Sequence, residues 1–394
     1  MQEPLKKIIA FILKTIRYGF LGNLFLLWIL SLPYALFTSI YDFPNAIPFS
    51  GKSWHNPYRS TNLLDTSAWK KSNFHGHTKA WGGLTDGKSQ HEIFLSAYRA
   101  MNYHTVGLSN YQFIDTSFAL EQGYIPCYEH GYNVWKRHHV CIGAKEVTWL
   151  DFIFGQSIHH KQTMLDKINP SVEVLAIAHP RFRGSFEPED FSVLTNYDCI
   201  EVLNHYRISE VQWDSALSAG RKAWIIGDDD THNVRDEGET GVCWTMIYAK
   251  SKTDLHDLTQ SLRSGMAYGV QGKRGAMGIL PKALGIKADS LYQLETDIAA
   301  DSIILIGQSG KVLSKVFNAS TIEYPIKKSD TYIRAKIFCN ENTLWMNPVF
   351  RNGNNSYKQA SPNLLYTFAY RAMWFALYGI IGFIVYRFRK TIFP

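Results

Sequence analysis

Residues 224–232 read WIIGDDDTH, an apolar run followed by three aspartates and, after Thr231, a histidine. Similar short apolar runs alternate with helix-like segments throughout residues 71–272. In α/β folds such runs are buried strands, and the polar residues that follow them collect at one edge of the sheet or barrel. The pattern therefore predicts an α/β domain over residues 71–272. The predicted strands are 104–108, 140–142, 174–178, 199–203 and 223–226.

The sequence changes in character after Gly272. Strand-like stretches there are separated by Gly, Asn and Ser, without helix-like segments between them. This spacing predicts a small β-rich domain over residues 273–352, similar to a sandwich. Its predicted strands are 302–306, 312–316, 332–338 and 344–349.

Two apolar stretches lie near the chain ends, at residues 19–41 and 364–386, and Arg371 is the only charged residue in either. A bilayer core takes about 20 apolar residues, so each is long enough to span it. Basic residues on their terminal sides predict cytoplasmic tails at 1–18 and 387–394. The remainder, beginning with a linker at 42–70, would then lie outside the cytoplasm, in the periplasm of a Gram-negative cell. A cleaved signal peptide is the alternative for the first stretch, but its length favours an anchor at the cell membrane.

Composition narrows the classes of function. The net charge of +7 is dispersed and lies partly beside the apolar stretches, so we predict a membrane contact and no nucleic-acid partner. The five cysteines show no CxxC and predict no disulfide. No feature identifies a protein partner.

Histidines and carboxylates follow several of the predicted strands. His75 and His77 form a His-x-His pair, and Asp86 follows in an Asp-Gly turn. On an extended segment, side chains two positions apart point to the same side, so both imidazoles are available to one first-row metal. A solvated loop pair is the alternative.

Glu129 follows a short strand, and ten residues later His139 begins the next. Together they could bridge and complete a two-metal centre. We favour this pair over Glu146 with His159, and His139 over its neighbour His138.

The remaining candidates follow later strands. His179 ends an apolar run before Pro180, and Arg181 next to it could meet an anionic substrate, as could Arg183. Three adjacent acids, Asp228 to Asp230, would repel one another without a cation, and Asp230 forms an Asp-x-His pair with His232. Glu201 and His205 could orient the ligands.

Taken in order, these motifs resemble those of the polymerase and histidinol phosphatase (PHP) superfamily. The resemblance covers residues 56–350 and is greatest to the carbaryl-hydrolase-type branch, through Asn56-Pro57-Tyr58, 69–73, 262–268, 332–334 and 345–348. It implies a distorted (β/α) barrel of seven strands. It also implies that His75, His77 and Asp230 bind one metal ion, that Glu129 bridges to a second held by His139 and His179, and that Asp86 and His232 help hold a third. Where many members have a histidine after the second strand this chain has Tyr111, a weaker ligand, so we expect two ions (Zn, Mn or Fe).

We therefore expect a membrane-anchored hydrolase that cleaves a small anionic phosphoester with a metal-bound hydroxide. Glu129 and Asp230 would act through the metal ions, Arg181 would neutralise charge, and His232 or Asp86 would supply a proton. Two alternatives remain at this stage. The same centre could hydrolyse a carboxylic ester, amide or carbamate, or the metal cluster could be purely structural.

Overall fold

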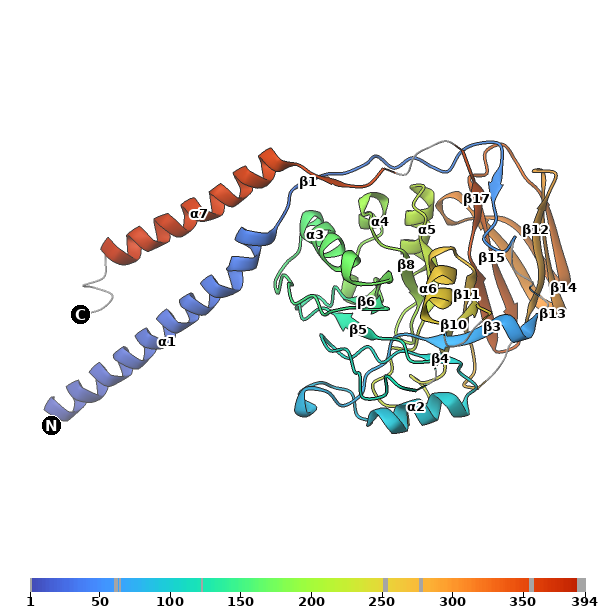
Figure 1. Ribbon diagram of the computed structural model, residues 1–394. Coiled ribbons are helices and arrows are strands. Elements are labelled where there is room, and N and C mark those ends of the chain that lie inside the picture. The colour runs from blue at the N-terminus through green and yellow to red at the C-terminus, as the bar shows by residue number, and fades with distance from the viewer. Residues whose placement is uncertain are drawn as a thin grey trace.

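The computed structural model describes residues 2–59, 63, 65–121, 123–250, 254–275, 279–353 and 358–387. Over these ranges the protein is a mixed α/β structure with open sheets, and a long apolar helix lies at each end of the chain (Figure 1). No ladder among the described strands closes into a barrel.

The two terminal helices are α1 (Gln2–Phe37) and α7 (Leu364–Arg387), and they project together from the globular part (Figure 1). Their apolar segments, Arg17–Phe37 and Leu364–Arg387, are long enough to cross a bilayer. Only 11% and 0% of them are buried, so neither is a core helix. The first helix ends four residues before the predicted limit at residue 41, because Tyr41–Asp42 forms strand β1 instead.

The helices contact each other and are joined where they meet the globular part. The hydroxyls of Ser31 and Tyr378 lie 2.8 Å apart. Arg371 donates to the carbonyl oxygen of Thr38 at 3.1 Å, so this charge within an apolar stretch has a partner. Strand β1 pairs antiparallel with β18 (Ser361–Pro362). Both linkers thus leave the globular part at one place.

A five-stranded sheet forms one half of the globular part, and every residue in its strands is buried. Its first three strands are antiparallel and its last three are parallel. In order, the strands are β5 (Cys127–His130), β6 (His139–Ile142), β7 (Val174–Ile177), β8 (Cys199–Leu203) and β9 (Trp224–Gly227). The intervening helices are α3 (Ile158–Ile168), α4 (Asp190–Val193) and α5 (Glu210–Ser218).

The second large sheet has eleven strands and runs from the β-rich segment into the α/β segment. Strand β16 pairs with β11, so hydrogen bonding continues across the predicted boundary at residue 272. The path is β12 (Pro281–Lys287), β13 (Leu291–Gly307), β15 (Tyr332–Cys339), β16 (Asn342–Met346), β11 (Ala267–Gln271), β10 (Cys243–Tyr248), β3 (Trp69–Asn73) and β4 (Thr105–Val106). Three further strands belong to this sheet but lie off the path: β14 (Lys311–Pro325), β17 (Val349–Arg351) and β2 (Trp54–His55). Apart from short 3₁₀ turns, the remaining described helices are α2 (His91–Ala100) and α6 (Leu255–Arg263).

Three isolated bridges connect the two sheets. Gly76 pairs with Thr231, beyond the ends of β3 and β9. Leu108 pairs with Pro126 and Tyr111 with Glu129, which joins the segment after β4 to β5. The chain segments that follow β3, β4 and β9 therefore meet beside β5. Most of the predicted metal ligands lie on these segments or on β5, whereas His139 begins β6 and His179 follows β7.

Candidate metal centre

The His75-Gly76-His77 turn follows β3 and is held in place by the backbone. The Asp230 amide donates to the His75 carbonyl at 2.9 Å, and the His77 amide donates to the Thr231 carbonyl at 2.8 Å. A Cβ on Gly76 would lie 2.3 Å from the buried ring of Phe94, so only glycine fits between the two histidines. The turn presents two buried imidazoles whose ring centroids are 5.3 Å apart.

These imidazoles take part in two buried triads that could each hold a metal ion. One is His75, Glu129 and His179, and the other is His75, His77 and Asp230. Within each triad the potential ligand atoms all lie within 4.8 Å of one another. His75 belongs to both, so the two triads overlap in one buried cluster that could bind metal ions.

The orientation of His75 fits a metal ligand. Its Nδ1 lies 3.1 Å from Glu201 Oε1, and this carboxylate fixes the tautomer that leaves Nε2 free. Nε2 lies 3.2 Å from Glu129 Oε1 and 3.2 Å from Asp230 Oδ1, yet it makes no hydrogen bond. Three potential ligand atoms thus converge on one position, as a bound cation would require.

The field in the cluster also favours positive charge. Burial alone would lower the pKa of His75, but the charges of Asp230, Glu201 and Glu129 outweigh it and raise that pKa well above its usual value. Burial opposes ionisation of Glu129, yet the neighbouring His138 and His75 hold its pKa well below the usual range. The carboxylates are thus ionised and can balance divalent cations.

His138, and not the predicted His139, lies against Glu129. Strands β5 and β6 pair with Glu129 opposite Val140, so alternate residues of β6 share the face of Glu129. His138 falls on that face, and its Nδ1 lies 2.6 Å from Glu129 Oε1. His139 points to the other face with His130, 5.5 Å away between ring centroids, and neither of its nitrogens has a hydrogen-bond partner.

His179 and Asp230 both have a left-handed backbone, with φ of 28° and 54°. Such conformations cost about 1–3 kcal/mol in a residue other than glycine and cluster at functional sites. His179 lies two residues after the end of β7, and Asp230 lies three residues after the end of β9. The backbone turn brings His179 Nε2 to 3.1 Å from Glu129 Oε1.

The three adjacent aspartates do not share one cation. Asp228 accepts the Phe74 amide at 2.6 Å, and burial raises its pKa well above the usual value. Asp229 accepts the Cys243 amide and the Tyr98 hydroxyl, at 2.8 and 2.7 Å, among other donors. Only Asp230 faces the cluster, so backbone donors, rather than a metal, relieve the repulsion expected for the other two.

Asp86 and His232 form a second pair beside the cluster, outside both triads. Their Oδ2 and Nε2 atoms are 3.3 Å apart, and the His232 ring stacks on His77 at 4.4 Å. Burial lowers the pKa of His232, but Asp86 and Asp230 raise it to about 9 overall. Tyr111 stands where the PHP pattern has a histidine. Its hydroxyl lies 3.4 Å from His232 Nε2, and its ring stacks on His77 at 4.5 Å.

Three other candidates lie elsewhere. Arg181 is exposed, and its guanidinium donates to the Ile208 carbonyl. Glu146 is exposed, and His159 Nδ1 accepts the Tyr41 amide near the spans, so the alternative Glu146 and His159 pair is not part of the cluster. His205 contacts the carbonyl of Asp229 rather than a ligand side chain.

No family model matches the chain, and no curated protein is significantly similar to it. The geometry of the cluster therefore carries the functional conclusion.

Proposed function

We propose that this protein is a membrane-anchored, metal-dependent phosphoesterase of the PHP superfamily. The observation that carries the proposal is the pair of overlapping buried triads joined through His75. The order of the motifs supports the family. So does the arrangement of β3 to β9, seven strands whose ladders and isolated bridges follow one another around a ring, as in a distorted barrel.

The chain offers ligands for two divalent ions. His75, His77 and Asp230 would hold one, and Glu129, His179 and His138 the other. Glu129 is suited to bridge them, because its Oε1 lies 3.2 Å from His75 and its Oε2 lies 3.3 Å from His77. When bound, such ions activate water and neutralise charge on phosphoryl oxygens.

The outer pair can deliver a proton to the leaving oxygen. With its pKa raised to about 9, His232 carries a proton at neutral pH. Asp86 orients its Nε2 from 3.3 Å, beside the Tyr111 hydroxyl. We assign His232 as general acid and Asp86 as the residue that positions it.

Glu129→Gln tests the proposal, with Glu146→Gln as the matched control. We expect the wild-type protein to bind two metal equivalents and to hydrolyse chromogenic phosphate esters. Glu129→Gln should lower metal affinity and turnover by about 100-fold or more, because it removes the bridging charge. Glu146 is exposed and outside the cluster, so Glu146→Gln should match the wild type.

Elemental analysis and turnover on phosphate and carboxylic esters are the readouts, with thermal unfolding to check the fold. Full metal content and full turnover in folded Glu129→Gln would reject the assignment. Metal binding without hydrolysis of any ester would indicate a structural cluster, and turnover on carboxylic esters alone would indicate a carbonyl hydrolase.

A further inference from the structure

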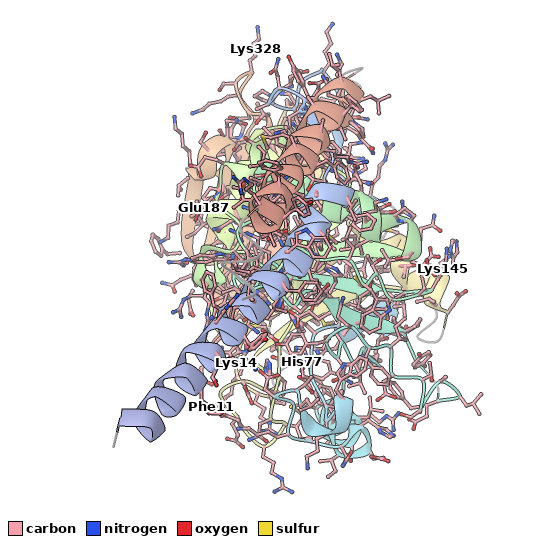
Figure 2. The ribbon with its side chains drawn as sticks, turned by 90° about the vertical axis from the view of Figure 1, so that its left-hand side faces the viewer. Phe11, Lys14, His77, Lys145, Glu187 and Lys328 are labelled. Carbon is pink, nitrogen blue, oxygen red and sulfur yellow. The ribbon has the colours of Figure 1, made fainter. Side chains whose placement is uncertain are left out.

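Large apolar side chains are exposed on the loops around the metal centre. Leu84, in the loop before α2, is 91% exposed, and Trp149, between β6 and α3, is 59% exposed. Trp81 is also exposed, three residues before Leu84, and so are Tyr132 and Trp135 in the loop between β5 and β6. The loop before α2, coloured blue, projects on the side of the globular part from which α1 and α7 leave (Figure 1). Figure 2 views the molecule from that side and labels His77.

One end of this apolar rim is attached to the first span. The Phe154 amide donates to the Tyr34 hydroxyl at 2.7 Å, and the rings of Tyr34 and Phe152 are 5.1 Å apart. Tyr34 lies three residues before the end of the apolar segment Arg17–Phe37, close to the edge of the bilayer core. The segment that carries Trp149 to Phe154 therefore lies near the headgroups.

The other end of the rim reaches the metal centre. The rings of Trp149 and Trp81 are 6.0 Å apart, and Trp81 Nε1 donates to the Tyr111 carbonyl at 2.8 Å. Tyr111 in turn stacks on His77 at 4.5 Å. A continuous series of contacts thus leads from the outer end of the span to a metal ligand.

Aromatic side chains are enriched where a membrane meets water, because their rings are apolar and their N–H and O–H groups remain hydrated. Exposed apolar patches of this kind mark protein or membrane contacts. The attachment to α1 favours the membrane. Lys136 Nζ lies 5.2 Å over the Tyr111 ring, so a cation that suits an anionic headgroup lies beside this series of contacts.

We propose that this rim, formed by Trp81, Leu84, Tyr111, Tyr132, Trp135 and Trp149, rests on the outer surface of the bilayer and admits the phosphodiester headgroup of a membrane lipid to the centre. The inference rests on the proposed function and names its substrate class. In the reaction a water oxygen bonds to phosphorus, one ester P–O bond breaks, and the departing oxygen takes a proton. The products are an alcohol and a phosphate monoester.

Membrane contact can be measured without any catalysis. The full chain would be placed in vesicles of phosphatidylcholine and phosphatidylglycerol containing brominated lipid, with a bimane label at Leu84→Cys or, as control, Phe317→Cys. All five native cysteines are buried, so labelling is selective. Phe317 is also exposed, at 64%, but lies on β14, on the side away from the spans (Figure 1). We expect strong quenching at position 84 only, and equal quenching at both positions would overturn the proposal.

Hydrolysis then tests the substrate. We expect turnover of phosphatidylglycerol in vesicles to exceed that of its soluble deacylated form, glycerophosphoglycerol. Leu84→Asp should lower vesicle turnover by about tenfold or more, because a leucine no longer enters the interface, while soluble turnover stays unchanged. Hydrolysis of the soluble diester alone would overturn the lipid assignment. No hydrolysis of either, with position 84 quenched, would reject the phosphoesterase function itself and the lipid substrate with it.

Discussion

His138 and His139 are neighbours in the chain but point to opposite faces of the sheet, and only His138 of the two contacts Glu129, so we propose His138 as the metal ligand. We expect His138→Gln to lower metal affinity by about 10–100-fold, the range seen when a ligand or its support is lost. His139→Gln should leave metal affinity unchanged. Equilibrium metal titration of both variants is the measurement, and an equal loss in both would contradict the assignment.

Lys71 is a buried cation whose charge opposes folding. Its Nζ lies between the rings of Tyr103 and Trp244, at 4.3 and 4.2 Å, and burial lowers its pKa to about 8. The unfolded chain holds this proton up to about pH 10.4. Below pH 8 the folded state bears the full cost of the buried charge, and the cost falls as pH rises from 8 toward 10.4.

Lys71→Met removes this titration. Between pH 7 and pH 9.5 the wild type should gain about 2 kcal/mol in free energy of unfolding relative to the variant, because only the wild type loses the cost of the buried charge. Raised tyrosine pKa values affect both proteins alike and cancel in the difference. Denaturant unfolding at the two pH values measures it, and a constant difference would show that Lys71 is not buried as a cation.

Most of the potential ligands could be predicted from the sequence, because Glu129, His179 and Asp230 come after apolar runs and His75 and His77 form a His-x-His pair. His75, His77, Glu129, His179 and Asp230 all meet in the cluster. The choice between His138 and His139 could not be made, because it depends on the pairing of His130 with His139, which is set by tertiary contacts. The backbone donors to Asp228 and Asp229 could not be predicted either, because they depend on tertiary contacts with Phe74 and with the start of β10.

At the scale of elements, α5 and β15 are held together by a buried ion pair. Arg334 is 1% exposed and binds Asp214 through two hydrogen bonds of 2.8 and 2.6 Å. Its third contact is Glu210, at 3.1 Å. The pair connects the β-rich segment to the five-stranded sheet.

Arg334→Met should lower the free energy of unfolding by about 3–5 kcal/mol, because Asp214 stays buried without its cation and, among the described residues, keeps only the Tyr332 hydroxyl as a donor. Adding Asp214→Leu should recover part of that loss, since an apolar pair replaces a lone charge. Thermal or denaturant unfolding of the two variants gives the comparison. A double variant less stable than Arg334→Met would show that the ion pair is not the source of the effect.

Four strands of the five-stranded sheet, β6 to β9, were predicted because each contains a short buried apolar run, and 199–203 coincides with β8. Strand β5 contains Glu129 and His130 and was not among the predicted strands. The separate β-rich domain was harder to define. Its edge strand β16 pairs with β11, and β13 and β14 extend to 17 and 15 residues, well beyond the predicted runs. Polar residues within these long strands face solvent, so hydrophobicity alone underestimates their length.

At the scale of the whole molecule, α1 and α7 project in the same direction (Figure 1), so the proposed membrane anchoring places both chain ends on the same side of the bilayer. Alkaline phosphatase, which is active only outside the cytoplasm, should therefore be inactive when fused after residue 394. The same reporter inserted at Asp289, an exposed residue in the turn between β12 and β13, should be active. Activity at the first position would contradict the proposed topology.

The two apolar stretches were enough to predict two helices of membrane-spanning length. How these helices lie relative to each other depends on contacts that no local sequence pattern predicts. The ladder between β1 and β18 joins residues more than 300 positions apart, with Tyr41 opposite Pro362. A globular domain connected to its membrane helix by a single chain segment could rotate freely above the bilayer. The paired strands β1 and β18 restrict rotation of the globular part about its connections, so a protein anchored through α1 and α7 would keep one side toward the bilayer.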